Sequence, residues 1–212
     1  MRKSWWFGGL GLAVTAAYSP RARRWYLTWG ATADEVARTM PGDELLLLPD
    51  IVSTRAVTID APPSEVWPWL VQMGSGRGGA YTYDWIENLL GLDMHSASEI
   101  LPQFQHLAVG DVLPMGDGSP GMRVEVCDPE QTLTLRSEDG RWVWIFGLYP
   151  DVSGMRLVSR NRIAEPGASP LRRLADRLLM EPGSLVMERR MLLGIRDRAE
   201  SVTDRPAPVP AH

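Results

Sequence analysis

Residues 54–91 read TRAVTIDAPPSEVWPWLVQMGSGRGGAYTYDWIENLLG, and this stretch decides the fold. Residues 54–59 are rich in β-branched side chains and predict a short strand, which a pair of prolines ends. The aromatic run at 64–73 predicts a helix, and the glycine-rich turn at 74–79 leads into a second short helix at 81–90. The chain therefore begins its folded part with one strand and two small helices.

Downstream of residue 110 the apolar pattern changes to a period of two. Five further strands are predicted, at residues 111–115, 122–126, 132–136, 141–149 and 154–163. The connections between them are short, so neighbouring strands should pair antiparallel. Helical segments follow at 171–180 and 185–199, and Pro182 should separate them because proline interrupts a helix. This order predicts an α+β fold in which a curved antiparallel sheet wraps around a long C-terminal helix and leaves a cavity.

Side-chain parity predicts which faces of these elements are buried. In the last strand Arg156, Arg160 and Arg162 share one face, which we expect to point to water. The opposite face, together with the aromatic face of the preceding strand, should point inward. On the last helix an apolar stripe joins four positions that the sheet should grip: Leu185, Leu192, Ile195 and Ala199.

The segments outside this core divide the chain into four parts. Residues 1–24 hold an apolar run at 5–18 between basic residues, and a membrane anchor, a cleaved signal and a helix docked on the domain all remain open. Residues 25–50 carry a capping box at Thr32 and Glu35, and this segment should pack on the outside of the domain. Residues 51–200 form the main domain. The proline-rich tail at 201–212 predicts disorder.

Composition excludes several functional classes. The net charge of −4 gives no basic surface for nucleic acid. The single cysteine, Cys127, excludes an internal disulfide and any zinc site with several cysteines. The signature sequences of common hydrolases, P-loop kinases and zinc proteases are absent. We therefore predict no cofactor and no metal.

The run from Ala61 to Gly91, with VWPWLVQM, GRGG and YDWIENLLG, resembles an uncharacterised bacterial branch of the START-like superfamily, also called SRPBCC or pollen-allergen-like helix-grip proteins. Shorter matching pieces are PQFQ at 102–105, VGD at 109–111 and VMERRML at 186–192. The resemblance spans about residues 41–199. It implies a helix-grip fold with a cavity that holds lipids, polyketides, hormones or other apolar molecules in various relatives. It implies no particular ligand and no catalytic residue set.

Pocket residues can be expected on the inward faces of the strands and on the gripped helix. Ser159 and Asn161 are polar on an otherwise apolar face, so they must either line the pocket or pair with the C-terminal helix. The methionines would adapt the last helix to different apolar shapes. The predicted ligand pocket consists of Trp67, Arg77, Trp142, Trp144, Met155, Leu157, Ser159, Asn161, Met187 and Met191.

Residues 74–79 satisfy the G-x-G-x-x-G pattern of dinucleotide-binding proteins, but here the glycines follow a helix rather than a strand. They are better explained as a tight turn that needs positive φ angles. Arg77 between these glycines should pair with Asp84 or Glu87, or else with a ligand carboxylate.

Asp84, His95 and His106 are weak candidates for acid–base catalysis, because histidine titrates near neutral pH and paired carboxylates can exchange protons. Asp93, His95 and His106 also suggest a metal site, but their spacing is too loose to predict one.

Three functions remain open at this point. The first is the binding of a hydrophobic small molecule or lipid by a monomer, in the cytoplasm or in association with the inner membrane through the N-terminal segment. The alternative is a polyketide cyclase- or dehydratase-like enzyme that uses the same cavity. It needs a titratable residue facing the pocket, and its candidates are Asp84, His95, His106 and Arg77. The third is an interaction module whose interior is filled by its own side chains.

Overall fold

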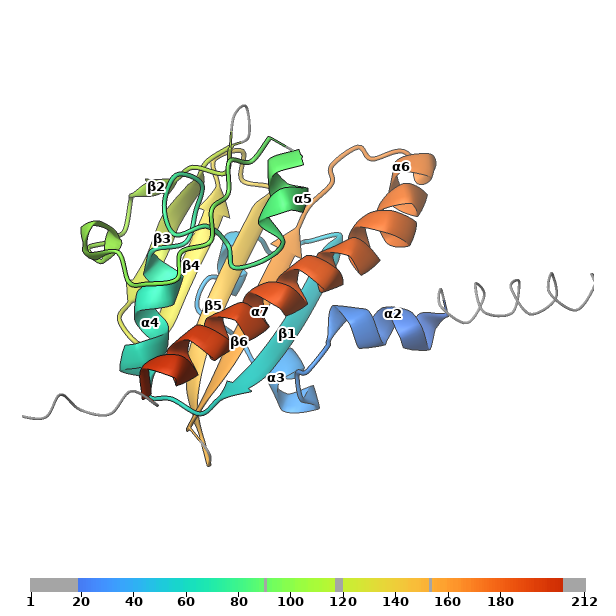
Figure 1. Cartoon of the computed structure of the whole chain (residues 1–212). Coiled ribbons are helices and arrows are strands. Elements are labelled where there is room, and N and C mark those ends of the chain that lie inside the picture. Colours follow the sequence, from blue (N-terminus) through green and yellow to red (C-terminus); the bar gives the residue numbers. More distant parts are fainter. Residues whose placement is uncertain (1–18, 90, 117–119, 153, 204–212) are drawn as a thin grey trace, which may run out of the picture.

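A six-stranded antiparallel sheet with the order β1-β6-β5-β4-β3-β2 forms the centre of the molecule (Figure 1). The computed structural model describes residues 19–89, 91–116, 120–152 and 154–203. The strands are β1 (Ile51–Ile59), β2 (Val112–Leu113), β3 (Met122–Asp128), β4 (Thr132–Ser137), β5 (Trp142–Asp151) and β6 (Gly154–Ile163). All six predicted strands are present, and every pairing is antiparallel as expected.

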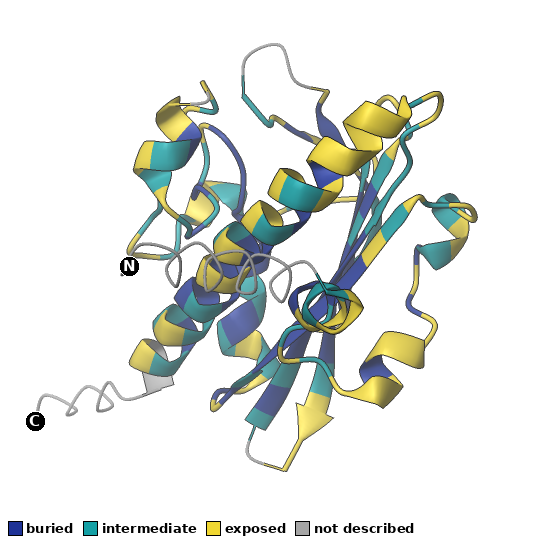
Figure 2. Cartoon of the chain, turned by 90° about the vertical axis from the view of Figure 1, so that its right-hand side faces the viewer, coloured by how far each residue is buried: buried dark blue, intermediate teal, exposed yellow. Residues whose placement is uncertain are grey.

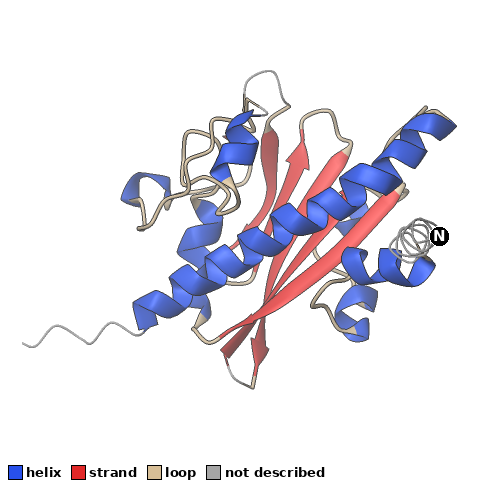
Figure 3. Ribbon diagram, turned by 45° about the vertical axis from the view of Figure 1, so that its right-hand side comes forward, coloured by secondary structure: helices blue, strands red, loops and turns tan. Residues whose placement is uncertain are grey.

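The helices lie on both sides of this sheet. They are α2 (Pro20–Leu27), α3 (Ala33–Ala37), α4 (Pro63–Val71), α5 (Asp84–Leu89), α6 (Pro170–Ala175) and α7 (Glu181–Thr203), with short 3₁₀ turns at Asp43–Leu45 and Pro102–Phe104. Figure 3 shows α7 crossing one face of the sheet diagonally. A curved, open antiparallel sheet around a long C-terminal helix is the helix-grip fold, so the predicted fold class is confirmed.

The main core lies between the sheet and α7. Three residues of the predicted stripe are buried there, since Leu192, Ile195 and Ala199 have no exposed surface. The fourth, Leu185, is 8% exposed and packs with Tyr26 and Leu27 in a separate cluster. Figure 2 shows the same division along α7, which is buried toward the sheet and exposed on its other side. Helix α4 adds Trp69 and its neighbours to this core. Burying such aromatic and aliphatic side chains contributes the largest favourable term in folding.

The opposite face of the sheet is also covered, which corrects the expectation that its arginines point to water. Arg160 is only 3% exposed and donates to the Asp43 carboxylate at 2.7 Å. Arg156 donates to both oxygens of Glu35, each at 2.8 Å. Arg162 also reaches Asp43. The segment that we expected on the outside of the domain supplies these partners, and the Thr32 capping box that begins α3 is present.

The C-terminal helical region is continuous, so the expected break at Pro182 is wrong. A single π-helical turn, Asp176–Met180, joins α6 directly to α7. Proline lacks the N–H that a helix interior uses for hydrogen bonding, so a regular α-helix would be expected to break here. The wider π turn just before it provides the local adjustment that keeps the chain helical.

Helix α5 is shorter than predicted because Tyr81 has a left-handed φ of 59°. Its hydroxyl donates to the carbonyl of Trp69 at 2.9 Å and so ties the start of this segment to α4. The glycine turn before it contains three positive φ angles, at Gly74, Gly76 and Gly79. A Cβ on Gly79 would lie 2.8 Å from the backbone of His95. The explanation as a tight structural turn is therefore confirmed.

Among the residues described, no helix combines the length and the apolar character that crossing a bilayer requires. The apolar run at 5–18, on which the alternatives of anchor, signal and docked helix depend, lies outside the described residues. Most of the tail at 201–212 does so as well.

Candidate functional site

A cavity of about 290 Å³ lies between the sheet, α5 and the first half of α7. Leu135, Trp142 and Trp144 form its wall on the sheet side. Met187 and Met191 close it from α7. The geometry that the fold class predicts is therefore present, and the third functional alternative, a fully filled interior, does not describe this molecule.

Methionine is the dominant residue type in the lining. Met73, Met94, Met115 and Met180 join the two methionines of α7 around the cavity. A methionine side chain has three rotatable bonds and a polarizable sulfur, so it can follow the outline of differently shaped apolar ligands. This wall is therefore adaptable, in contrast to the sheet side.

The tryptophans on the sheet side are held in place by their own hydrogen bonds. The rings of Trp142 and Trp144 stack with centroids 5.3 Å apart and an interplanar angle of 21°. The indole N–H of Trp142 donates to Asn161 Oδ1 at 2.8 Å, and that of Trp144 donates to Ser159 Oγ at 2.9 Å. Because both N–H groups are satisfied inside the protein, the rings present rigid apolar surface to the cavity.

Behind these rings a buried ion pair connects β1 with α7. The Arg55 guanidinium is fully buried and donates to the Glu188 carboxylate. Ser159 and Asn161 donate to the other oxygen of Glu188, at 2.6 and 3.1 Å. Burial raises the pKa of Glu188, while Arg55 and the two side-chain donors oppose that shift.

The other two nitrogen atoms of the Arg55 guanidinium also donate hydrogen bonds. Its Nε donates to the carbonyl of Tyr26 at 2.9 Å, and Nη2 donates to Ser184 Oγ at 2.9 Å. Arg55, Asn161 and Glu188 all touch the cavity. This polar side of the cavity is therefore internally satisfied and needs no ligand to complete it.

A different polar group faces the cavity from α5. Glu87 is 6% exposed, and its Oε2 is buried without a hydrogen-bond partner. The Thr82 hydroxyl, also cavity-lining, is likewise buried without a partner. Burial raises the pKa of Glu87, the Thr82 side chain opposes the shift, and the charge of Asp84 adds to it.

The residues predicted for the pocket fall into two groups. Those that line the cavity are Trp142, Trp144, Asn161, Met187 and Met191. Met155 and Leu157 are packed in the core instead, and Trp67 lies half-buried against that core. Ser159 is fully buried and bonds to α7 through Glu188, which is the pairing alternative considered for it.

Arg77 does not take either of its expected carboxylate partners. It donates to the carbonyl oxygens of Val71 at 2.8 Å and Met73 at 3.1 Å, and it stacks over the ring of Phe104 at 4.3 Å. Burial lowers its pKa, and the charge of Asp111 opposes that shift. The guanidinium therefore closes the end of α4 by satisfying carbonyl groups that helix termini leave open.

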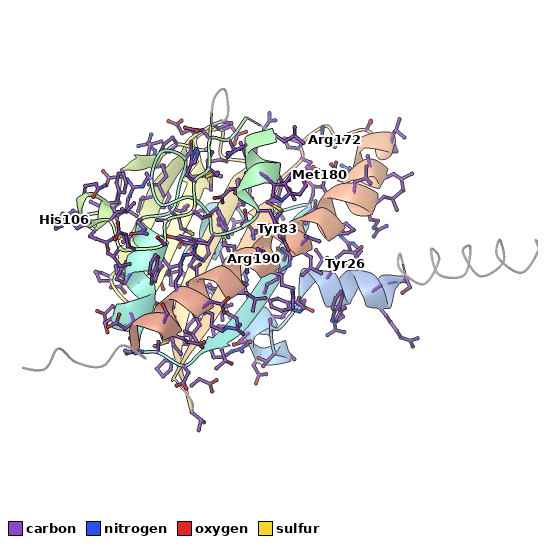
Figure 4. The ribbon with its side chains drawn as sticks, in the orientation of Figure 1. Tyr26, Tyr83, His106, Arg172, Met180 and Arg190 are labelled. Carbon is purple, nitrogen blue, oxygen red and sulfur yellow. The ribbon has the colours of Figure 1, made fainter. Side chains whose placement is uncertain are left out.

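The three weak catalytic candidates also lie away from the cavity lining. Asp84 accepts from the backbone N–H and the hydroxyl of Ser96, at 2.8 and 2.5 Å. His95 is 77% exposed beside Asp93, and Figure 4 shows His106 at the outer edge of the molecule. Within the described ranges, no group of three or more potential ligands is placed to hold a metal ion.

Sequence reasoning missed Arg55 and Glu188, and it named Glu87 only as a partner for Arg77 and not as a cavity residue. Arg55 shares its strand face with Val57 and Ile59, and Glu188 lies between Leu185 and Leu192 on the apolar stripe of α7. A charged residue at an inward position was the available signal, since such residues are buried only with a partner or a function.

No protein-family model and no curated protein match this chain, whereas solved structures do. A KanY protein is 14% identical with a TM-score of 0.48, covering 72% of this chain and 99% of its own. A Polyketide_cyc-like protein from Corynebacterium glutamicum is 14% identical with a TM-score of 0.40, covering 75% of this chain and 97% of its own. The Aha1 dimer from Colwellia psychrerythraea is 13% identical with a TM-score of 0.42, covering 71% and 96%. At these values the likeness carries no argument about ligand or activity, and the fold assignment rests on the strand order and the gripped helix.

Proposed function

We propose that this protein binds an apolar small molecule or lipid in the cavity between the sheet and α7. The observation that supports this most is the lining itself, which combines two hydrogen-bonded indole rings with six methionines. The volume of about 290 Å³ is close to the lower end of small-molecule sites, which begin near roughly 300 Å³. A ligand with two fused rings or a medium-length chain would fit this space.

The lining also explains why an apolar ligand would be preferred. A dry apolar cavity loses dispersion contacts on its inner surface, and a ligand restores them. The tryptophan N–H groups are already paired, so they offer no hydrogen bond that a polar ligand could gain. Burying apolar ligand surface contributes roughly 25 cal/mol for each Å² removed from water.

The enzyme alternative rested on Arg77, Asp84, His95 and His106. None of these four side chains lines the cavity, because Arg77 closes a helix end, Asp84 binds Ser96 and the two histidines are exposed. Binding is therefore the function that the geometry supports. Membrane association through residues 5–18 stays a prediction.

Native mass spectrometry of the purified full chain, before and after organic extraction, tests the proposal directly. We expect a co-purified small molecule that extraction removes, and subsequent uptake of a fluorescent fatty acid or an aromatic polyketide mimic. Ala80→Phe should reduce uptake, because Ala80 lines the cavity and a phenyl ring would occupy it. Ala108→Phe is the control, since Ala108 is exposed and lies outside the lining.

Two results would overturn this proposal. One is a protein that arrives empty and takes up neither class of probe. The other is uptake that Ala80→Phe and Ala108→Phe leave equally unchanged, because the probe would then bind elsewhere on the surface.

A further inference from the structure

The cavity contains two polar regions that differ in one respect. Around Arg55 and Glu188 the polar groups bond to one another. Around Glu87 the polar side-chain atoms lack such partners. In the described part of the chain four buried side-chain nitrogen or oxygen atoms lack a partner, and two of them, Thr82 Oγ1 and Glu87 Oε2, belong to residues that line this cavity.

An unpartnered carboxyl group in such a position is costly. Leaving a buried polar group without a hydrogen bond costs about 1–3 kcal/mol, and more when the group is charged. No lysine, arginine or histidine among the described residues forms an ion pair with Glu87. A partner from outside the chain would remove this cost, and the cavity is where such a partner would be.

The residues around Glu87 also influence the protonation state of its carboxyl group. Burial raises the pKa of Glu87, an effect that the Thr82 hydroxyl opposes and that Asp84 on the same helix strengthens. Since no cation among the described residues balances these effects, the shift is toward the neutral acid. A neutral carboxyl group has an O–H that donates a hydrogen bond, and the Thr82 hydroxyl is a second donor.

We propose that Glu87 and Thr82 form the polar subsite of the cavity and take the carbonyl oxygen of an otherwise apolar, uncharged ligand such as a ketone. This inference rests on the proposed function. A carbonyl oxygen accepts two hydrogen bonds, which matches the two donors. A ligand carboxylate would place a further negative charge near Asp84, and like charges in a buried site repel.

A matched pair of probes isolates the carbonyl contribution. 2-Acetylnaphthalene and 2-ethylnaphthalene have nearly the same shape and differ mainly in one oxygen atom. Isothermal titration calorimetry on the full chain would give the Kd of each probe for the native protein, Glu87→Met, Thr82→Val and the exposed control Glu99→Met. The relevant quantity is the ratio of the two Kd values, since it cancels changes in general packing.

We expect Glu87→Met to reduce the preference for the ketone by about three- to tenfold, which corresponds to one net hydrogen bond. Thr82→Val should reduce it less, and Glu99→Met should leave it unchanged. In Glu87→Met and Thr82→Val the affinity for 2-ethylnaphthalene should change by a smaller factor than the affinity for the ketone. The infrared carbonyl band of the bound ketone should lie at lower frequency in the native protein than in Glu87→Met.

Several outcomes would overturn the inference. Equal weakening of both probes by Glu87→Met would show that Glu87 only supports packing. Tighter binding of 1-(2-naphthyl)ethylamine than of the ketone at pH 7 would show an ionised Glu87 that selects cations.

If Glu87→Met does not fold, the ratio of the two Kd values in Thr82→Val and the carbonyl band in the native protein decide the question. If the hydrocarbon binds but the ketone gains nothing, only the subsite is wrong, whereas failure of both probes refutes the proposed function itself.

Discussion

Replacing Arg55 by Met should strongly destabilise the protein. Arg55 is fully buried and donates to Glu188, Tyr26 and Ser184. Without the guanidinium, Glu188 remains buried with only the neutral donors Ser159 and Asn161. Removing one partner of a buried ion pair costs about 3–5 kcal/mol, because the other charge stays uncompensated.

The pH dependence of this loss provides an internal check. Burial already raises the pKa of Glu188, and losing Arg55 should raise it further. A carboxyl group whose folded pKa lies above its unfolded value binds more protons when folded, so stability falls as pH rises from the unfolded pKa toward the folded one. The deficit of Arg55→Met relative to the native protein should therefore be larger at pH 8 than at pH 5.

Urea unfolding followed by far-UV circular dichroism at the two pH values measures these free energies. Arg190→Met on the exposed side of α7 is the matched control and should change stability by less than about 0.5 kcal/mol. The double variant Arg55→Met with Glu188→Leu should be less destabilised than the sum of the two single variants by about 1 kcal/mol or more. A loss below about 1 kcal/mol for Arg55→Met at pH 8, or strict additivity in the double variant, would refute the view that the pair is a coupled buried unit.

Three further perturbations address other parts of the structure. Burial alone would raise the pKa of Glu35, but hydrogen bonds from Arg156 and from the helix start lower it overall. The stability that Glu35 contributes is therefore present above its unfolded pKa and is lost as pH falls through its folded pKa. Glu35→Gln should therefore cost about 1–2 kcal/mol near pH 7 and less near pH 3, measured by urea unfolding, and an equal cost at both would contradict this assignment. Gly79→Ala should lower the melting temperature more than Gly76→Ala, because both have positive φ but only Gly79 faces backbone atoms within 3 Å; equal shifts would count against the close approach. Because the pKa of Glu87 is raised by burial, Glu87→Gln should gain stability relative to the native protein as pH increases from 4 to 8, and a constant difference in thermal unfolding would argue against a buried neutral acid.

The sheet could be predicted from the sequence because its signals are local. Strand β6 was predicted with both of its ends, since alternating residues between two turns define it without reference to the rest of the chain. The same alternation placed Trp142 and Trp144 on the inner face. The glycine turn could be predicted because only glycine adopts positive φ angles at little cost.

The outer face of the sheet could not be predicted in the same way. Arg160 and its partner Asp43 are separated by 117 residues, and each of them is compatible with water when considered alone. The arginines of β6 lie at alternating positions, and nothing in that strand shows that a covering segment exists. The pairing involves two segments that are far apart in the sequence. One has three arginines on one strand face, and the other has acidic residues near a capped helix. Long-range pairing of this kind needs coordinates or an explicit search for complementary charge.

The three charged residues of the cavity that sequence reasoning did not place there share a feature that the sequence does contain. Arg55 and Glu188 each interrupt an apolar face with a charge, and the two interruptions compensate each other across the core. Sequences usually avoid such conflicts except at functional or strained sites, where the cost is compensated elsewhere. Glu87 is a third buried residue with an ionisable side chain, and its Oε2 finds no compensating partner among the described residues. Where two buried charges account for each other and a third buried acid faces an apolar cavity, the missing partner should be part of whatever occupies that cavity.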